Sequence, residues 1–205
     1  MNIDFNIPDC EEFQRGYIVF NETEKPGVRQ IWFDAVSIVS DGWGDPIRMA
    51  DGIERIIRGW NRFYANFDFD SLVNCIENKL STLEIFRNRD IQTLSEADAQ
   101  EMEVLFNAFL DALQRRPDLR KSPVSVAKAL SVLEPNFFPL WDSWIAYAYG
   151  CWYFSDTAAP RYILFCKKMK SMAERLTICV PSPDDRPLLK RIDEYNFAKY
   201  TAHWL

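Results

Sequence analysis

The stretch SPVSVAKALSVLEPNFFPLWDSWIAYAYG, residues 122–150, decides the fold of this chain. It predicts two short apolar helices joined by a rigid turn, because Pro135 and Pro139 end the first helix and fix the start of the second. Lys128 is expected within the first helix. Asp142 is expected near the N-terminus of the second, where a carboxylate accepts backbone N–H bonds and interacts favourably with the helix dipole. The stretch therefore places one lysine and one aspartate among apolar residues.

Lys128 and Asp142 have a structural and a chemical interpretation. In the structural one, Asp142 caps its helix, and Lys128 is a surface lysine or the ion-pair partner of Asp142. In the chemical one, the two side chains share a cleft, Lys128 is a nucleophile with a pKa lowered by burial, and Asp142 orients water or stabilises developing positive charge. Trp141, Trp144 and Tyr147 are then candidates to stack on a base. The residue pattern leaves both interpretations open.

Outside this stretch, apolar residues recur every three or four positions in five further segments. The expected helices are 45–64 (Asp45 as N-cap), 70–86 (Asp70 as N-cap), 95–113 (Ser95 and Asp98 as a capping box), 160–178 and 186–205. A break is expected at VPSPDDRP, residues 180–187. About seven helices with little strand predict one all-α domain over residues 1–205, with a helical body at 45–205.

The first 44 residues are harder to interpret. Strand-like fragments at 16–21 and 30–39 are separated by the turn-prone ETEKPG, which fits a short hairpin. A helical interpretation of the same residues fits equally well.

Composition and charge limit the class of protein. With 205 residues, of which 48% are apolar and 15% aromatic, the chain is expected to fold around a sizeable core. The net charge of −6 argues against a broad nucleic-acid-binding surface, although a local basic patch remains open. Arg115, Arg116, Arg120 and Lys121 form such a cluster, which is either a solvated helix end or a phosphate contact beside the cleft.

Cysteine and histidine usage bears on redox state and metals. The five cysteines show no CxxC spacing, and an odd number cannot all pair within one molecule, so reduced thiols in the cytoplasm are expected. With His203 as the single histidine, no metal or other cofactor is expected. The N-terminus does not match a secretory signal, and no apolar run reaches the roughly 20 residues of a membrane-spanning helix. The expectation is a soluble cytoplasmic protein that has no membrane partner; its other partners are unknown.

Residues 127–150, together with RYILFCKKMK (161–170) and RIDEYNFAKY (191–200), resemble a group of uncharacterised microbial proteins. Their shared pattern is a lysine-bearing helix, a proline-led turn, a Trp-Asp pair and a later acidic-Tyr-Asn segment. That group is distantly similar to the helix-hairpin-helix DNA glycosylase superfamily, over about residues 95–200. The resemblance implies a glycosylase-like all-α fold, with Lys128 in place of the Schiff-base lysine and Asp142 in place of the aspartate that supports base excision.

Two features depart from that superfamily. Val124 and Val126 stand where its hairpin has glycines, which let backbone N–H groups approach a DNA phosphate. The interval of 14 residues from Lys128 to Asp142 is also short. Glycosylase activity is thus not supported by the hairpin, and a fold does not carry a function with it.

The function is left unassigned by the sequence, with two alternatives. One is a base-excision or related hydrolytic enzyme that uses Lys128 and Asp142; it predicts that both side chains face one cavity with a basic rim. The other is a non-enzymatic interaction module that binds a partner through the aromatic loop 152–154; it predicts a filled core at the pair and an exposed apolar patch.

Overall fold

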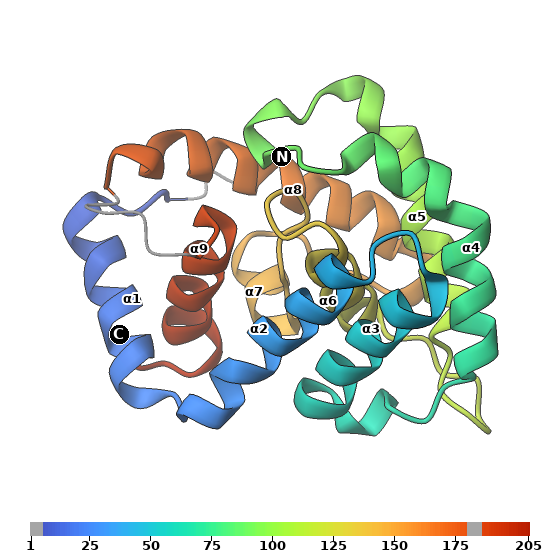
Figure 1. The fold of residues 1–205 in the computed structure, drawn as a ribbon. Coiled ribbons are helices and arrows are strands. Elements are labelled where there is room, and N and C mark those ends of the chain that lie inside the picture. Colours follow the sequence, from blue (N-terminus) through green and yellow to red (C-terminus); the bar gives the residue numbers. More distant parts are fainter. Residues whose placement is uncertain (1–5, 180–185) are drawn as a thin grey trace.

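The computed structural model describes residues 6–179 and 186–205, and in these ranges the chain is all-α with no strand (Figure 1). The α-helices are α1 (Cys10–Thr23), α2 (Pro26–Asp41), α3 (Pro46–Trp60), α4 (Phe69–Phe86), α5 (Ala99–Ala112), α6 (Pro123–Leu133), α7 (Ser143–Ala148), α8 (Ala158–Leu176) and α9 (Leu188–Asn196). A π-helix, Phe197–Thr201, continues α9. The predicted all-α class with a single domain is confirmed, whereas most of the predicted break at 180–187 lies outside the described residues.

Within the first 44 residues, the two segments that could have formed a hairpin lie in helices α1 and α2, so the hairpin alternative is wrong. The Asp9 carboxylate caps α1 by accepting a backbone N–H at 2.8 Å, and Pro26 starts α2, where its missing N–H costs no helical bond. On α2 the buried residues Trp32, Ala35 and Val39 follow each other at intervals of three and four. This is the spacing of one helix face, and the core buries that face.

Among the helices predicted outside residues 122–150, the N-terminal caps are confirmed at two and wrong at a third. Asp45 caps α3, and Ser95 with Asp98 forms the capping box that precedes α5. At α4 the cap is Asp68, whose carboxylate accepts a backbone N–H at 3.0 Å, and Asp70 lies inside the first turn. Both aspartates suit a helix start electrostatically, so the residue pattern alone could not distinguish them.

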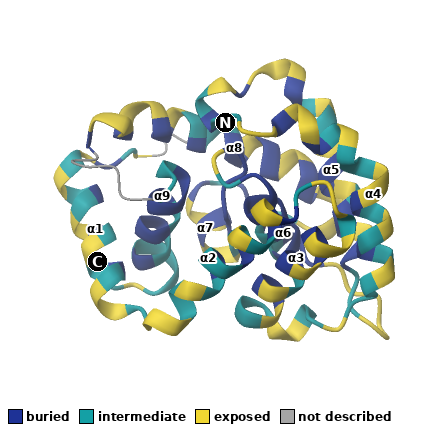
Figure 2. Ribbon diagram, in the orientation of Figure 1, coloured by how far each residue is buried: buried dark blue, intermediate teal, exposed yellow. Residues whose placement is uncertain are grey.

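Helix α6 is the buried centre of the domain, packed against α2, α3 and α5 (Figure 2). Nearly all of its residues are buried, and its small side chains, among them Ala127 and Ala129, let the surrounding helices come close. The turn after it is anchored from α8, where the Tyr162 hydroxyl donates to the carbonyl oxygen of Pro139 at 2.8 Å. The rigid turn predicted from the prolines is therefore held by a tertiary contact as well.

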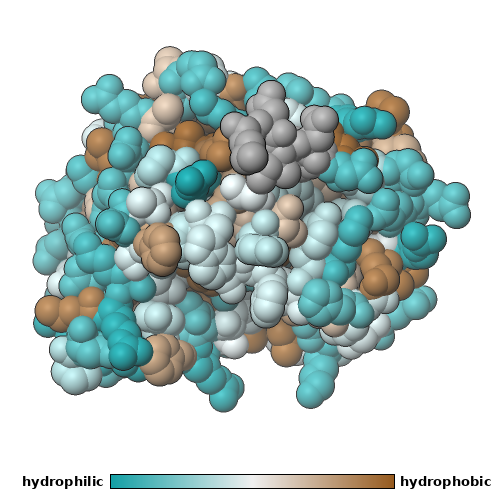
Figure 3. Space-filling view, turned by 180° about the vertical axis from the view of Figure 1, so that it is seen from behind, coloured by the Kyte–Doolittle hydropathy of each residue, from teal (hydrophilic) through white to brown (hydrophobic). Residues whose placement is uncertain are grey.

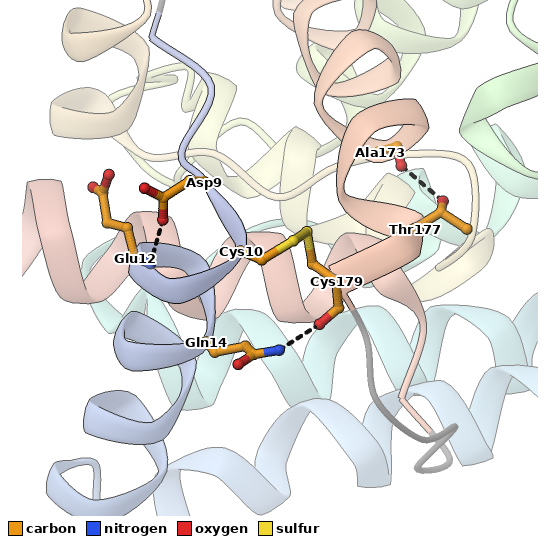
Figure 4. Close-up of a disulfide and its surroundings, with 7 residues drawn as sticks. All are labelled: Asp9, Cys10, Glu12, Gln14, Ala173, Thr177 and Cys179. Atoms are coloured by element: carbon orange, nitrogen blue, oxygen red, sulfur yellow. Dashed lines mark hydrogen bonds between the residues drawn. A yellow bond between two sulfur atoms is a disulfide. The ribbon is translucent and has the colours of Figure 1, made fainter.

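A disulfide joins Cys10, at the start of α1, to Cys179, in the turn after α8 (Figure 4). The Cα atoms are 5.0 Å apart although 169 positions separate the residues. The Gln14 side-chain amide donates to the carbonyl oxygen of Cys179 at 2.8 Å and ties the two segments further. The expectation that the cysteines are all reduced is wrong for this pair, because the pairing depends on tertiary proximity and not on spacing in the sequence.

The surface seen from behind mixes hydrophilic and apolar residues, and the strongly apolar patches on that face are small and separated (Figure 3). In the described part of the chain, none of the helices has the length and apolar character needed to cross a bilayer. The same residues contain no cluster of three or more His, Cys, Asp or Glu side chains suited to hold a metal ion.

Candidate functional site

A cavity of about 300 Å³ lies where α1, α2, α6 and α9 meet the end of α3 and the start of α7. Its aromatic lining residues are Phe20, Trp60, Trp141 and Phe197. Its charged lining residues are Glu24, Arg29, Lys128, Asp142, Lys190 and Asp193. The volume is at the small end of the range of ligand pockets, and the mixture of apolar walls with a few polar groups is typical of such sites.

Lys128 projects from α6 into this cavity. Its Nζ donates to the carbonyl oxygen of Trp60, the last residue of α3, at 3.0 Å. Burial lowers the pKa of Lys128 to about 8, and the nearby carboxylates Asp142 and Asp193 offset part of that effect. The amine of Lys128 is therefore less basic than that of an exposed lysine, and it borders the cavity.

Asp142 is the N-cap of α7, as predicted. Its Oδ1 accepts the backbone N–H of Ile145 at 2.8 Å, and its Oδ2 accepts the hydroxyl proton of Thr201 at 2.6 Å. No ion pair joins Asp142 to Lys128, although both line the same cavity. Thr201 belongs to the π-helix, an element that is rare and often found at functional sites.

Lys190 is the most deeply buried cation of the cavity wall, with 3% of the residue exposed. Its Nζ is 2.8 Å from an Asp193 carboxylate oxygen and 3.3 Å from one of Glu194. Burial alone would lower the pKa of Lys190, but the two carboxylates outweigh it and hold this pKa above its usual value. The ammonium also lies near the rings of Phe20 and Trp60, at 5.2 and 5.5 Å. Lys190 is thus a neutralised, structural cation.

Arg29 reaches the cavity from α2. Its Nη1 donates to Oδ1 of Asn21 at 2.7 Å, and the same oxygen accepts from Arg186 at 2.9 Å. Its Nε is buried and has no hydrogen-bond partner. Within residues 6–179 and 186–205, Arg29 forms no ion pair with a carboxylate.

The three aromatic residues proposed for stacking do not gather at one place. Trp141 is 2% exposed, lines the cavity and stacks on Tyr153 with ring centroids 4.6 Å apart. Trp144 and Tyr147 are 59% and 68% exposed and line a separate surface hollow with Trp152. Trp141 thus lies within reach of a ligand in the Lys128 cavity, whereas the other two are not among the residues that line it.

The basic cluster predicted for phosphate contact is paired with carboxylates. Its ion pairs are Arg115 with Asp118, Arg116 with Asp68 (3.1 Å), Arg120 with Asp118 (3.1 Å) and Lys121 with Asp111 (2.6 Å). None of the four basic residues lines the Lys128 cavity, although Lys121 and Asp142 share an adjacent hollow. Their phosphate-binding role stays a prediction.

Arg29, Lys190 and Trp60 are lining residues that the sequence did not point to. For Lys190, the acidic residues three and four positions later indicate an ion pair, but they do not indicate that it is buried. For Arg29 and Trp60, no local signal exists, because their role depends on where α2 and α3 cross α6.

Comparisons with protein-family models, with curated proteins and with solved structures find no match for this chain. The similarity to helix-hairpin-helix glycosylases therefore remains a proposal.

Proposed function

We propose that this protein is a lysine-dependent enzyme of the base-excision or related hydrolytic type, acting on a base-bearing substrate. The observation that carries the proposal is the position of Lys128, whose pKa is lowered to about 8 and whose side chain lines a cavity with aromatic walls. With that pKa, roughly a tenth of the amine is unprotonated at pH 7, a far larger fraction than for an ordinary lysine. Such lysines serve as amine nucleophiles.

The proposed reaction begins with attack of the Lys128 Nζ lone pair on the sugar carbon that carries the base. The bond from this carbon to the base breaks, and its electrons leave with the base, which takes up a proton. Nζ gives up both of its protons, one to the base and one to the ring oxygen as the bond between that oxygen and the sugar carbon breaks, and an imine between Nζ and the sugar carbon results. Water then adds to the imine carbon and releases the lysine, so that the net reaction is hydrolysis. Asp142 stabilises the positive charge that develops or orients the water.

The charge distribution supports a short or monomeric substrate over a long duplex. The chain carries a net charge of −6, and the four residues of the basic cluster are already paired with carboxylates. Long nucleic acids obtain most of their binding free energy from the neutralisation of phosphates by unpaired Lys and Arg. The cavity, in contrast, is large enough for a single base.

Borohydride trapping tests this function. The protein is incubated with nucleosides, with oligonucleotides that carry damaged bases and with abasic-site DNA, reduced with borohydride, and examined by mass spectrometry. We expect a covalent adduct on the peptide that contains Lys128. The adduct should disappear in Lys128→Ala and persist in Lys167→Ala, whose lysine binds Glu96 on the surface. Absence of an adduct with every probe, or an adduct that survives Lys128→Ala, contradicts the proposal.

An interaction module is the second candidate, and an exposed aromatic patch favours it. The patch consists of Trp144, Tyr147 and Trp152, which line one surface hollow and have exposures of 59%, 68% and 51%; Phe154, two residues after Trp152, is 70% exposed. The filled core that this alternative predicts at Lys128 and Asp142 is not present, because a cavity lies there. A gene-deletion phenotype that is rescued by Lys128→Ala but not by a Trp144→Ser, Tyr147→Ser double variant would favour the module over the enzyme.

A further inference from the structure

We infer that the ligand of this cavity joins a planar base to an oxyanion, as a nucleoside monophosphate does, and that Arg29 binds the oxyanion. This inference rests on the proposed function for the base-bearing part of the ligand. The anionic part of the ligand is inferred from the hydrogen-bond donors of the cavity. The N–H groups that lack a protein acceptor there, among the residues that the structure describes, belong to two cationic side chains.

Arg29 keeps most of its donors free. A guanidinium has five N–H donors. The bond from Nη1 to Asn21 uses one of them, and the buried Nε has no partner. A buried donor without a partner costs free energy, so such a group in a native protein needs an explanation, and a bound ion or ligand is one. The planar fork of N–H groups matches carboxylate and phosphate oxygens in geometry.

The carboxylates of the cavity do not neutralise Arg29. Both oxygens of Asp142 accept hydrogen bonds from Ile145 and Thr201, and Asp193 is bonded to Lys190. The remaining acid, Glu24, accepts the backbone N–H of Lys25 at 2.8 Å. No carboxylate in the described part of the chain forms an ion pair with Arg29, so its charge is available to a ligand.

Lys128 is the second cation with spare donors. Its ammonium has three N–H groups, of which one is bonded to the carbonyl oxygen of Trp60. Lys190, in contrast, is held by Asp193 and Glu194. Two cations with free N–H groups therefore face a cavity whose walls include Trp60 and Trp141. This arrangement fits a flat ring between aromatic side chains with an oxyanion at Arg29.

Isothermal titration calorimetry with matched ligand pairs tests the inference on the full chain. Each common nucleoside 5′-monophosphate is compared with its nucleoside, and uracil is compared with its carboxylate, orotate; inorganic phosphate is titrated alone. We expect at least one anionic member to bind about tenfold or more tightly than its uncharged partner, because charge-assisted hydrogen bonds are stronger than neutral ones. Comparison of the nucleotide pairs with the uracil and orotate pair tells whether phosphate or carboxylate is the preferred oxyanion.

Variants assign the effect to Arg29. Arg29→Gln should reduce the affinity for the anionic ligand to that of the uncharged one, and Arg29→Lys should give an intermediate value because it keeps the charge without the fork. Arg175→Gln, at an exposed position of α8 away from the cavity, should change nothing. If Arg29→Gln fails to fold, the titration of Arg29→Lys alone tests the role of Arg29. An affinity of Arg29→Lys for the anionic ligand equal to that of the parent protein would then refute the assignment to Arg29.

Several results would refute the inference without touching the proposed enzyme. These are equal affinities within each ligand pair, no binding of any probe, inorganic phosphate binding as tightly as the nucleotides, or a preference that persists in Arg29→Gln. If a borohydride adduct forms at Lys128 and one of these results is also obtained, the oxyanion site is refuted and the proposed enzyme is retained. If binding depends on Arg29 but no adduct forms, the proposed enzymatic function is refuted and the oxyanion site is retained.

Discussion

Thr201 donates its hydroxyl proton to Asp142 at 2.6 Å, across 59 positions of the sequence. The bond connects the π-helix near the end of the chain to the N-cap of α7. Because Asp142 also accepts the backbone N–H of Ile145 at 2.8 Å, both of its oxygens are engaged by donors other than Lys128. Asp142 is thus held in place independently of Lys128, and the amine of Lys128 forms no ion pair with it.

Replacement of Thr201 by valine should therefore destabilise the fold by about 1 kcal/mol, the usual net value of one hydrogen bond. Urea denaturation measures this loss as a lower transition midpoint with an unchanged slope. Thr23→Val, at an exposed position at the end of α1, is the matched control and should stay within about 0.5 kcal/mol of the parent. A Thr201→Val protein as stable as the parent would show that the bond contributes nothing.

The lowered pKa of Lys128 should make stability depend on alkaline pH. Its pKa is about 8 in the folded protein, against a reference value of 10.5. Between these values the unfolded chain binds more protons, so the free energy of unfolding rises as the pH increases from 8 to 10.5. The full difference is about 3 kcal/mol, and it should be missing in Lys128→Met but present in Lys167→Met. Parallel stability curves for the parent and Lys128→Met would contradict the assigned pKa.

Asp98 should contribute stability that is lost in acid. The Arg89 guanidinium donates to both of its oxygens, at 2.8 and 3.0 Å, and holds the pKa of this carboxyl at about 2. The contribution is fully present above the unfolded pKa of about 4 and disappears as the pH falls to about 2. Asp98→Asn should cost about 2 kcal/mol at pH 7 and almost nothing at pH 2, as measured by denaturation at each pH. The exposed Asp51→Asn variant serves as a control, and a cost for Asp98→Asn that does not vary with pH would refute the prediction.

The disulfide between Cys10 and Cys179 should contribute about 2–5 kcal/mol, because it closes a long loop in the unfolded chain. Denaturation with and without a reductant measures this difference, and a non-reducing peptide map detects the linked peptides. Cys10→Ser should reproduce the loss and remove the sensitivity to reductant. Cys75→Ser, at a free cysteine, should leave that sensitivity intact. Unlinked peptides from protein purified without a reductant would refute the pairing.

Local rules predicted the helical body and its best-defined caps. Asp45, the capping box of Ser95 with Asp98, and Asp142 act within three residues of their own positions, so the sequence contains all the information that they need. The same information was ambiguous where two interpretations were locally equal. Asp68 rather than Asp70 caps α4, and residues 16–21 lie in helix α1, which buries Phe13, Gly16 and Phe20 on one face.

The sequence by itself determined that the chain is all-α and that Lys128 and Asp142 lie on neighbouring elements beside apolar residues. Tertiary structure alone decided that the two share a cavity without an ion pair, that Arg29 and Lys190 join them, and that Cys10 pairs with Cys179. The physical reason is the distance along the sequence over which the deciding contacts act. Caps and helical periodicity depend on contacts over three or four residues, whereas the cavity is assembled from side chains between Phe20 and Phe197, whose positions depend on how the helices cross.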